Sequence, residues 1–206
     1  MKFTLGTKSH MTEIFSEDGT VKAVTVIQSG PIVVTQVKGV GDKNGYNAIQ
    51  VGYGAKRESL VNKPEKGHVK ELGGFKFFKE FRVESKPEQK VGDKIEVSVF
   101  TPGDVVEVSA ISKGKGFQGV VKRHDFRGGQ RTHGQKHSER EPGAIGGGAR
   151  AGGRVAKGLR MAGRMGGDRV TVKNLRIVQV DAENGLILVS GAVPGRRGTL
   201  VEVRSA

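Results

Sequence analysis

The chain of 206 residues contains no cysteine, which excludes a disulfide framework, a cysteine nucleophile and any metal site built on thiolates. This absence is compatible with a reducing compartment but does not require one. Long apolar runs are also missing: the run Leu186–Val189 is among the longest, whereas a membrane span needs about 20 residues. Residues 1–30 lack the charged and then apolar pattern of a signal peptide. We therefore expect a soluble protein.

Sequence patterns that carry catalysis are missing as well. The chain has no G-x-S-x-G nucleophile elbow and no P-loop of the form G-x-x-x-x-G-K-[ST]. The Asp and Glu residues are spread out as a solvated face, and no pair of carboxylates stands in a setting that would perturb its pKa. We therefore expect neither an enzyme nor a bound cofactor.

Positive charge and glycine are both in excess. Lys and Arg total 35 against 21 Asp and Glu, which gives a formal net charge of +14 and a pI of about 10.1. A surplus of this size opposes the compact state, because like charges repel, and it indicates a polyanionic partner. Glycine accounts for 33 residues, more than twice its usual share of roughly 7%.

Both excesses are concentrated in one segment, Lys113–Arg169. Its 57 residues hold five Lys and nine Arg against four acidic residues, a net charge of +10 that leaves only +4 for the rest of the chain. The segment also holds 16 of the 33 glycines, and its few large apolar residues follow no period of 2 or 3.6. It cannot bury enough surface to offset its ordering entropy, so we expect it to be disordered on its own.

The residue types of this segment suit RNA. Glycine permits close approach of the backbone, and Arg makes bidentate phosphate contacts and stacks through its guanidinium plane. Aromatic residues are scarce (Phe117 and Phe126), which favours recognition of folded RNA through shape and phosphates over stacking on single strands. The histidines stand beside cations that would repel a metal ion, so we assign them to phosphates or bases. The expected RNA-binding side chains are Lys113, Lys115, Lys122, Arg123, Arg127, Arg131, His133, Lys136, His137, Arg140, Arg150, Arg154, Lys157, Arg160 and Arg164.

A glycine motif in the same segment permits a different function. Gly114–Gly119 reads G-x-G-x-x-G and follows a predicted strand, as dinucleotide-binding loops do. Such a loop also needs a helix that aims its N-terminus at the pyrophosphate and an acidic residue about 20 positions on. Lys122–Gly134 has no helical period, so a nucleotide-dependent enzyme is the weaker alternative.

Closely spaced strands are predicted on both sides of the basic segment. Alternating or β-branched runs are separated by turn signals such as Ser29–Pro31 and the hairpin dipeptide Asn184-Gly185. This spacing favours a small antiparallel barrel or sandwich. The predicted strands are Val21–Ile27, Ile32–Val37, Ile95–Phe100, Val105–Ile111, Val170–Asp181, Leu186–Val193 and Thr199–Val203.

One interval departs from this pattern and predicts a small α+β insert. Asn62–Glu65 resembles a capped helix start with proline in the first turn, and Gly73-Gly74 would end that helix. Four phenylalanines follow in Phe75–Phe81, which we interpret as a satellite core where the insert packs on the barrel; nucleotide stacking is the alternative. The expected fold is therefore mainly β, with a barrel at residues 1–44, 86–112 and 169–206, the insert at 45–85 and an extended basic Gly/Arg-rich arm at 113–168.

A series of motifs occurs in a characteristic order along the whole chain. The most specific is Ser112–Arg123, and the others are Leu5–Lys8, Met11–Phe15, Thr132–Gly134, Pro142–Gly146, Met161–Gly166, Arg169–Val172, Asn184–Val189 and Gly191–Gly195. Together they resemble the large-subunit ribosomal protein L-three family in its bacterial form.

This resemblance implies a structural constituent of the large ribosomal subunit without catalytic chemistry. The barrel would be of the translation-protein type and lie on the ribosome surface, while the arm would thread into large-subunit ribosomal RNA (rRNA) toward the peptidyl transferase centre. The family also implies support of early subunit assembly, a cytoplasmic location, and ribosomal proteins of the L-fourteen and L-nineteen type as neighbours. A free-standing RNA chaperone or nucleic-acid-binding module is the alternative, because the basic arm alone would permit it.

Three positions depart from the family's pattern. His10 stands where glycine is usual, and His124-Asp125 stand where some bacterial members have Trp-Asn. Some bacterial members have a methylated glutamine at the arm tip. The tip Gly146–Arg150 has no glutamine, so the resemblance implies no such methylation in this chain.

Overall fold

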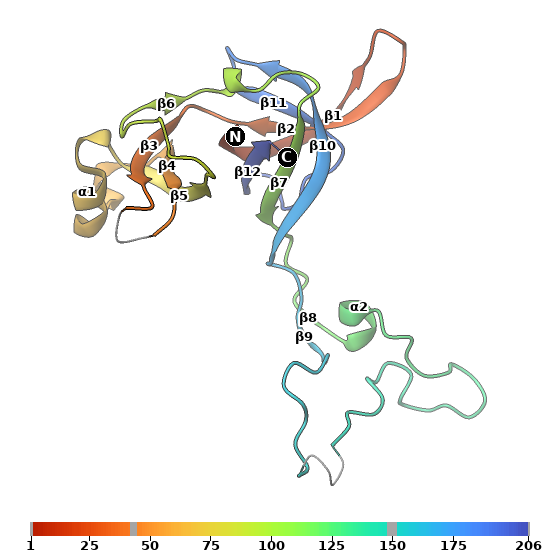
Figure 1. The fold of residues 1–206 in the computed structure, drawn as a ribbon. Helices are drawn as coiled ribbons and strands as arrows, with labels where there is room; N and C mark the ends of the chain where they lie inside the picture. Colours follow the sequence, from red (N-terminus) through yellow and green to blue (C-terminus); the bar gives the residue numbers. More distant parts are fainter. Residues whose placement is uncertain (1, 42–44, 148–151, 206) are drawn as a thin grey trace. The chain divides into compact units, whose positions relative to one another are not determined.

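The structure is a computed structural model, and it describes residues 2–41, 45–147 and 152–205 (Figure 1). The chain divides into two compact units, residues 1–111 with 169–206 and residues 112–168. The first unit contains two β-sheets, and the second contains a short stem and one helix. No described helix is long and apolar enough to cross a membrane.

Six antiparallel strands of the first unit close into a barrel in the order β1–β12–β7–β10–β11–β2 (Figure 1). The register shifts between Lys8 and Met11 in β1 and between Val172 and Leu175 in β10. Shifts of this kind bend a strand and help a sheet to close on itself. The barrel strands are β1 (Phe3–Phe15), β2 (Val21–Gln28), β7 (Val105–Ile111), β10 (Arg169–Asp181), β11 (Leu186–Ser190) and β12 (Leu200–Ser205).

Alternating side chains fill the barrel. Val106 and Val108 of β7 and Val201 and Val203 of β12 are fully buried, and the residues between them face outward. Successive side chains of a strand point to opposite faces, so these valines meet in one hydrophobic core. The predicted mainly-β class with a small antiparallel barrel is therefore confirmed.

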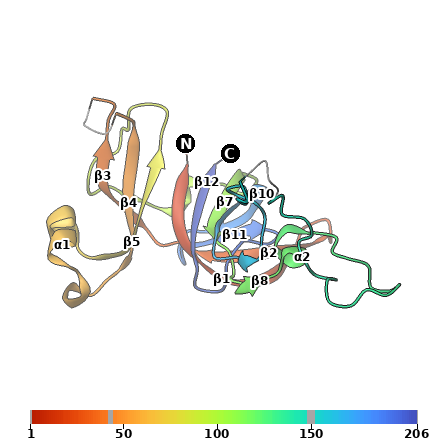
Figure 2. The same cartoon turned by 90° about the horizontal axis from the view of Figure 1, so that it is seen from below.

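A second sheet of four strands, in the order β5–β4–β3–β6, belongs to the same unit (Figure 2). The Phe81 ring of β5 stacks on the Phe3 ring of β1 with 4.4 Å between centroids. A second buried cluster joins Phe3 and Leu5 to apolar side chains of this sheet, so the phenylalanine run does contribute to a satellite core against a barrel strand. The strands are β3 (Ile32–Lys38), β4 (Ala48–Ala55), β5 (Phe75–Arg82) and β6 (Lys94–Ile95).

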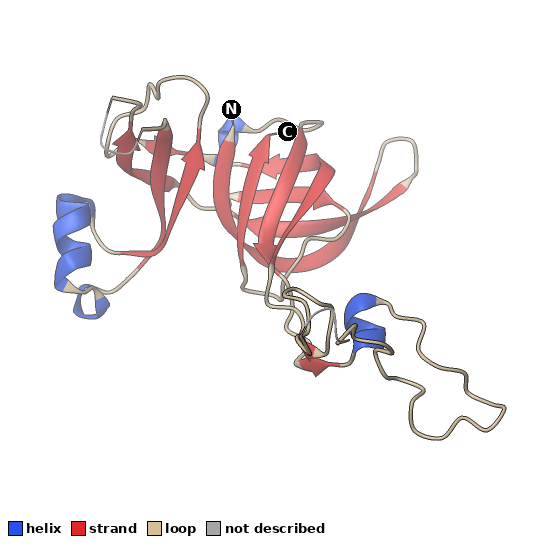
Figure 3. Cartoon of the chain, turned by 60° about the horizontal axis from the view of Figure 1, so that its bottom comes forward, coloured by secondary structure: helices blue, strands red, loops and turns tan. Residues whose placement is uncertain are grey.

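The predicted helix in the insert is present as α1 (Lys63–Val69), at the far end of the second sheet from the barrel (Figure 3). Asn62 and Glu65 form a reciprocal capping box, in which the Glu65 carboxylate accepts the Asn62 backbone N–H. A 3₁₀ turn, η2 (Lys70–Leu72), continues α1, and Gly73 follows with a φ of +90°. Another turn, η1 (Glu58–Leu60), precedes the helix.

One strand assignment from the sequence is wrong, and one predicted strand lies in a different sheet from the one expected. Ile95–Phe100 does not form one strand, because β6 ends at Ile95 and a 3₁₀ turn, η3 (Val97–Val99), follows. Val97 and Phe100, three residues apart, are the buried side chains, which is the spacing of a 3₁₀ turn and not of a strand. The expected strand Ile32–Val37 is present as β3 (Ile32–Lys38), but it pairs with β4 and β6 and not with the barrel strands.

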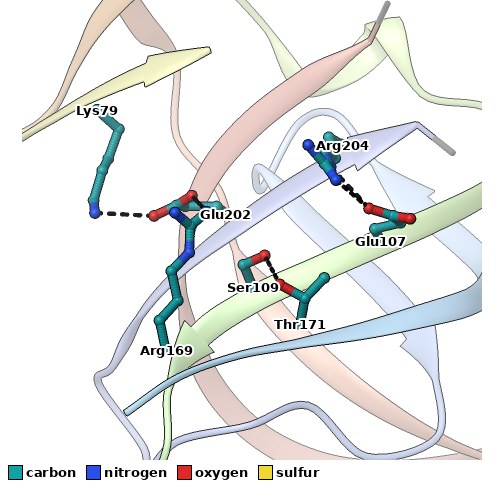
Figure 4. A network of polar contacts seen from close by, with 7 residues as sticks. All are labelled: Lys79, Glu107, Ser109, Arg169, Thr171, Glu202 and Arg204. Atoms are coloured by element: carbon teal, nitrogen blue, oxygen red, sulfur yellow. Dashed lines mark hydrogen bonds and ion pairs between the residues drawn. The ribbon is translucent and has the colours of Figure 1, made fainter. Parts of the chain in front are cut away.

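Carboxylates on the outer surface of the barrel bind the neighbouring cations (Figure 4). Glu202 of β12 forms ion pairs with Arg169 of β10 and with Lys79 of β5, the latter at 3.0 Å. Glu107 of β7 accepts a hydrogen bond of 2.9 Å from Arg204 Nε, and this bond holds the pKa of the Glu107 carboxyl below its usual range. Three barrel strands and one strand of the second sheet are thus joined by paired charge.

Replacement of the buried Phe81 tests how the two sheets hold together. Phe81→Ala removes a ring that is 94% buried against Phe3, and we expect a loss of about 3–5 kcal/mol in the free energy of unfolding. Phe15→Ala, at a ring that is 68% exposed, is the matched control and should cost less than about 1 kcal/mol. Urea unfolding measures both, and equal losses would contradict this packing.

Acid unfolding should depend on Asp104, in the turn before β7. Its carboxylate accepts hydrogen bonds from Lys2 Nζ and the Thr101 backbone N–H, which lower the Asp104 pKa from 3.8 to about 2. Because the folded-state pKa is the lower one, this stabilisation is present above pH 4 and disappears as the pH falls toward 2. We expect Asp104→Asn to be less stable than the parent at pH 6 and to show a flatter stability profile between pH 4 and 2. Urea midpoints at several pH values measure this, and parallel profiles would refute it.

Candidate nucleic-acid interface

The second unit, residues 112–168, starts and ends in a two-stranded stem. β8 (Phe117–Gln118) pairs antiparallel with β9 (Gly163–Arg164). Next to this pair, the Lys115 N–H donates to the Met165 carbonyl at 2.9 Å, and the Met165 N–H donates to the Gly116 carbonyl at 2.9 Å. The backbone itself therefore holds the two ends of the arm together.

Glycine is required at Gly166, where the two ends of the arm leave no room for a Cβ. Gly166 has a φ of +74°, and a Cβ at this position would lie 2.2 Å from the Lys113 carbonyl oxygen. At Gly163 a Cβ would lie 2.6 Å from a guanidinium nitrogen of Arg123. Any side chain at Gly166 would meet main-chain atoms that cannot give way, so only glycine allows the stem strands to approach this closely.

One turn of helix, α2 (Val120–His124), follows β8 and is bonded to Met161, two residues before β9. Val120 is only 2% exposed, which makes it the buried anchor of this turn. The Arg123 guanidinium donates to the Met161 carbonyl oxygen at 2.7 Å, and a His124 ring N–H donates to the same oxygen at 3.1 Å. These two basic side chains therefore shape the arm from within.

Contacts around one aromatic ring continue this internal framework. The Arg160 guanidinium lies over the Phe126 ring, 5.1 Å from its centroid, and the His124 ring lies 6.0 Å from the same centroid. Arg160 is nevertheless exposed, so its outer edge is accessible to a ligand. Phe126 thus serves as a support for cations.

Beyond α2 the chain forms a closed loop. The Gly129 N–H donates to the Glu139 carbonyl at 2.9 Å, and Gln135 Nε2 donates to the Ser138 hydroxyl at 2.6 Å. The basic side chains between these contacts all point into solvent: Arg131, His133, Lys136 and His137, with Arg140 directly after the loop. One main-chain bond and one side-chain bond therefore hold the loop together and leave its cations exposed.

Most of the predicted RNA-binding side chains are exposed, and none of the described ones forms an ion pair. Among the described residues, all seven ion pairs of the chain lie in the first unit, and none includes a residue of the arm. Arg123 is half-buried, and Arg150 lies outside the described residues. The exposed members of the predicted set are Lys113, Lys115, Lys122, Arg127, Arg131, His133, Lys136, His137, Arg140, Arg154, Lys157, Arg160 and Arg164.

The sequence reasoning missed two further candidates. The Phe117 side chain on the stem is 77% exposed, so its ring is available for stacking on a base. In the first unit, Arg196 and Arg197 are exposed on the turn between β11 and β12, which the Gly198 N–H fixes to the Lys8 carbonyl at 2.7 Å. The signal for this turn was present in Pro194-Gly195, directly before the two arginines.

The glycine motif Gly114–Gly119 does not have the geometry of a nucleotide loop. Its residues 115–118 belong to the antiparallel stem, where Lys115 and Gly116 bond to Met165 and Phe117–Gln118 form β8. The preceding strand, β7, lies in an antiparallel barrel, whereas dinucleotide loops connect a parallel strand to a helix. In the described part of the chain, no three His, Asp or Glu side chains group as metal ligands would.

A closed barrel that carries an arm of unpaired cations defines a structural nucleic-acid-binding protein. A family model described as Ribosomal protein L3 matches residues 82–186. The chain is 50% identical to the large ribosomal subunit protein uL3 of Acidothermus cellulolyticus, over the whole of this chain and 93% of that relative. It is also 50% identical to uL3 of Finegoldia magna (all of this chain, 98% of the relative) and 49% identical to uL3 of Herpetosiphon aurantiacus (98% and 95%). The chain belongs to the ribosomal protein L3 family.

Membership of this family makes the protein a structural constituent of the large subunit of the cytoplasmic ribosome. It functions in translation as a ribonucleoprotein component and not as an enzyme. The resemblance found from the sequence motifs is thereby confirmed.

A substitution at the narrow part of the stem tests whether the arm depends on its main-chain pairing. Gly166→Ala places a Cβ against the Lys113 carbonyl and in an unfavourable backbone conformation, which should cost about 1–3 kcal/mol locally. We expect the amides of Lys115 and Met165 to lose hydrogen-exchange protection in assembled large subunits. Gly147→Ala is the control, because among the described residues no atom beyond its chain neighbours lies within 4 Å of its Cβ position. Equal protection in both variants would refute the stem.

Proposed function

We propose that residues 113–168 form an arm that binds folded large-subunit rRNA through its exposed cations. The observation that carries this proposal is the contrast between the two units: the ion pairs of the described chain all lie in the first unit. Surface cations without acidic neighbours retain their full attraction for phosphates. The arm is therefore the part of the chain best suited to an RNA backbone.

The side chains of the arm divide into two roles. Arg123 and His124 bind the Met161 carbonyl and give the arm its shape, and Arg160 combines a contact with Phe126 and an exposed edge. The other exposed cations bind phosphates directly, and the exposed Phe117 ring stacks on an unpaired base. The paucity of aromatic rings favours recognition of folded RNA by shape.

The family resemblance supports a proposed position of the protein in the particle. The arm reaches toward the peptidyl transferase centre, the barrel stays at the subunit surface, and the protein supports early subunit assembly. Ribosomal proteins of the L-fourteen and L-nineteen type are the neighbours we assign to the first unit. The described residues of the first unit offer folded, partly apolar surface for such protein contacts.

The salt dependence of RNA binding tests the proposed role of the arm. Replacing Arg131, Lys136 and Arg140 by glutamine removes three exposed cations, so the slope of log K against log salt concentration should become shallower by roughly 2–3 units. The charge-matched control replaces Lys86, Lys90 and Lys94, exposed in the first unit, by glutamine. Its slope should stay close to that of the parent. Filter binding to large-subunit rRNA measures both, and equal slopes would show that net charge alone drives binding.

A free-standing RNA chaperone is the competing function, since it would use the same cations. The two functions differ in the stability of the complex with the ribosome, because a nonspecific binder is stripped from RNA at high salt. We expect the protein to co-sediment with large subunits after washing at high salt. A variant lacking residues 128–158 should keep a folded first unit and co-sediment poorly. Complete loss of the parent protein in the wash would favour the chaperone.

A further inference from the structure

The end of the β1–β2 hairpin extends beyond the barrel. β1 pairs with β12 through Phe3–Thr7, and β2 pairs with β11 through Val24–Gln28. In the described strands, residues 11–15 pair with residues 21–25 of the same hairpin and with no other strand. The Gly191 N–H, directly after β11, donates to the Ala23 carbonyl at 2.8 Å and is the last contact of the barrel with the ribbon among the backbone bonds of the described residues. The two-stranded ribbon is visible where it leaves the barrel wall (Figures 1 and 3). Here we call residues 11–23 the hairpin tip.

One face of the hairpin tip is apolar and open to solvent. Phe15 is opposite Val21, and Glu13 is opposite Ala23, so these side chains and Met11 share one face of the ribbon. Phe15 is 68% exposed, Val21 is 53% exposed and Met11 is 49% exposed. Large apolar side chains that gather on one exposed face are typical of an interaction site.

The turn that ends the tip is well formed. The Ser16 N–H donates to the Thr20 carbonyl and the Gly19 N–H donates to the Ser16 carbonyl, both at 2.9 Å. Gly19 has a φ of +73°, which suits it to this position. The apolar face is therefore presented by a regular hairpin, although a two-stranded ribbon has little stability of its own in water.

The charge of the hairpin tip is opposite to that of the rest of the chain. Residues 11–23 carry Glu13, Glu17 and Asp18 against a single cation, Lys22, so their net charge is −2 in a protein of +14. Glu13 stands within the apolar face, and the other two carboxylates stand in the turn. Carboxylates at this density repel phosphates, so RNA does not fit this surface. The surface instead fits a protein partner with an apolar patch that is edged with lysine and arginine.

We propose that the hairpin tip docks on a basic protein of the large subunit, with the Phe15 and Val21 side chains in an apolar depression and the three carboxylates facing cations around it. This inference rests on the proposed function, since it needs the chain to be part of the subunit. Burial of an aromatic anchor supplies affinity, and the surrounding opposite charges supply specificity. The same contact stabilises a ribbon that lacks a third strand.

Photo-cross-linking in assembled large subunits tests this contact. Phe15 is replaced by p-benzoylphenylalanine in the full-length chain, which conserves an aromatic side chain at an exposed position. We expect a cross-link to one ribosomal protein, at a segment that contains lysine or arginine. Reversal of the turn charges by Glu17→Lys with Asp18→Lys should lower the cross-link yield by about tenfold or more. The matched control reverses two exposed carboxylates elsewhere, Glu84→Lys with Glu88→Lys, and should leave the yield unchanged.

The outcomes separate this inference from the proposed function. A cross-link to rRNA or to a second copy of the chain overturns the inference, as does the absence of any cross-link in subunits that contain the protein. A yield that is insensitive to the turn charges overturns the charge complementarity on which the choice of partner depends. Failure of the unsubstituted parent chain to enter subunits is a different result, because it overturns the proposed function and the inference together.

Discussion

Electrostatic repulsion within a chain of net charge +14 is the constraint on which the arrangement of this structure depends. In the first unit, ion pairs reduce this repulsion. Glu107 and Glu202 each bind two cations on the outer surface, and Asp104 binds Lys2. The folding of this unit can then rely on valine, isoleucine and phenylalanine packed in two cores. In the described part of the arm no such ion pairs occur, so its charge is balanced only when a polyanion binds.

The arm consequently has a different source of order. Its stem is held by backbone hydrogen bonds, its glycines allow main-chain atoms to approach within distances that a Cβ would forbid, and Arg123 bonds a carbonyl 38 residues away. Few apolar side chains take part, with Val120 as the buried exception. The main chain sets the shape of such a segment, so nearly all of its cationic side chains can face outward. A charged loop built on an apolar core could not present them so completely.

Much of the barrel could be predicted because period-2 alternation and turn dipeptides are local signals. Val105–Ile111 and the hairpin at Asn184-Gly185 are such cases. Local signals do not determine which strands pair, and for that reason Ile32–Lys38 was assigned to the wrong sheet. They also fail where a 3₁₀ turn buries residues three apart, as at Val97 and Phe100. Much of β1 is not predicted, since its outer half mixes polar and apolar residues and lacks the β-branched runs on which strand prediction depends.

The sequence also predicts the candidate site only in part, because the contacts of single side chains depend on the fold. Composition placed the basic residues in one segment, but only the folded arm separates Arg123, which binds Met161, from neighbours such as Lys122 that face solvent. The acidic hairpin tip was invisible to composition, because its charge of −2 is lost within a total of +14. The exposed apolar face of the tip is recognised only from the strand pairing. The register places Phe15 opposite Val21, beyond the last residues that pair with β11. The proposed binding of RNA by the arm and of a protein by the hairpin tip requires that opposite charges lie on different segments, so that neither partner meets the charge that would repel it.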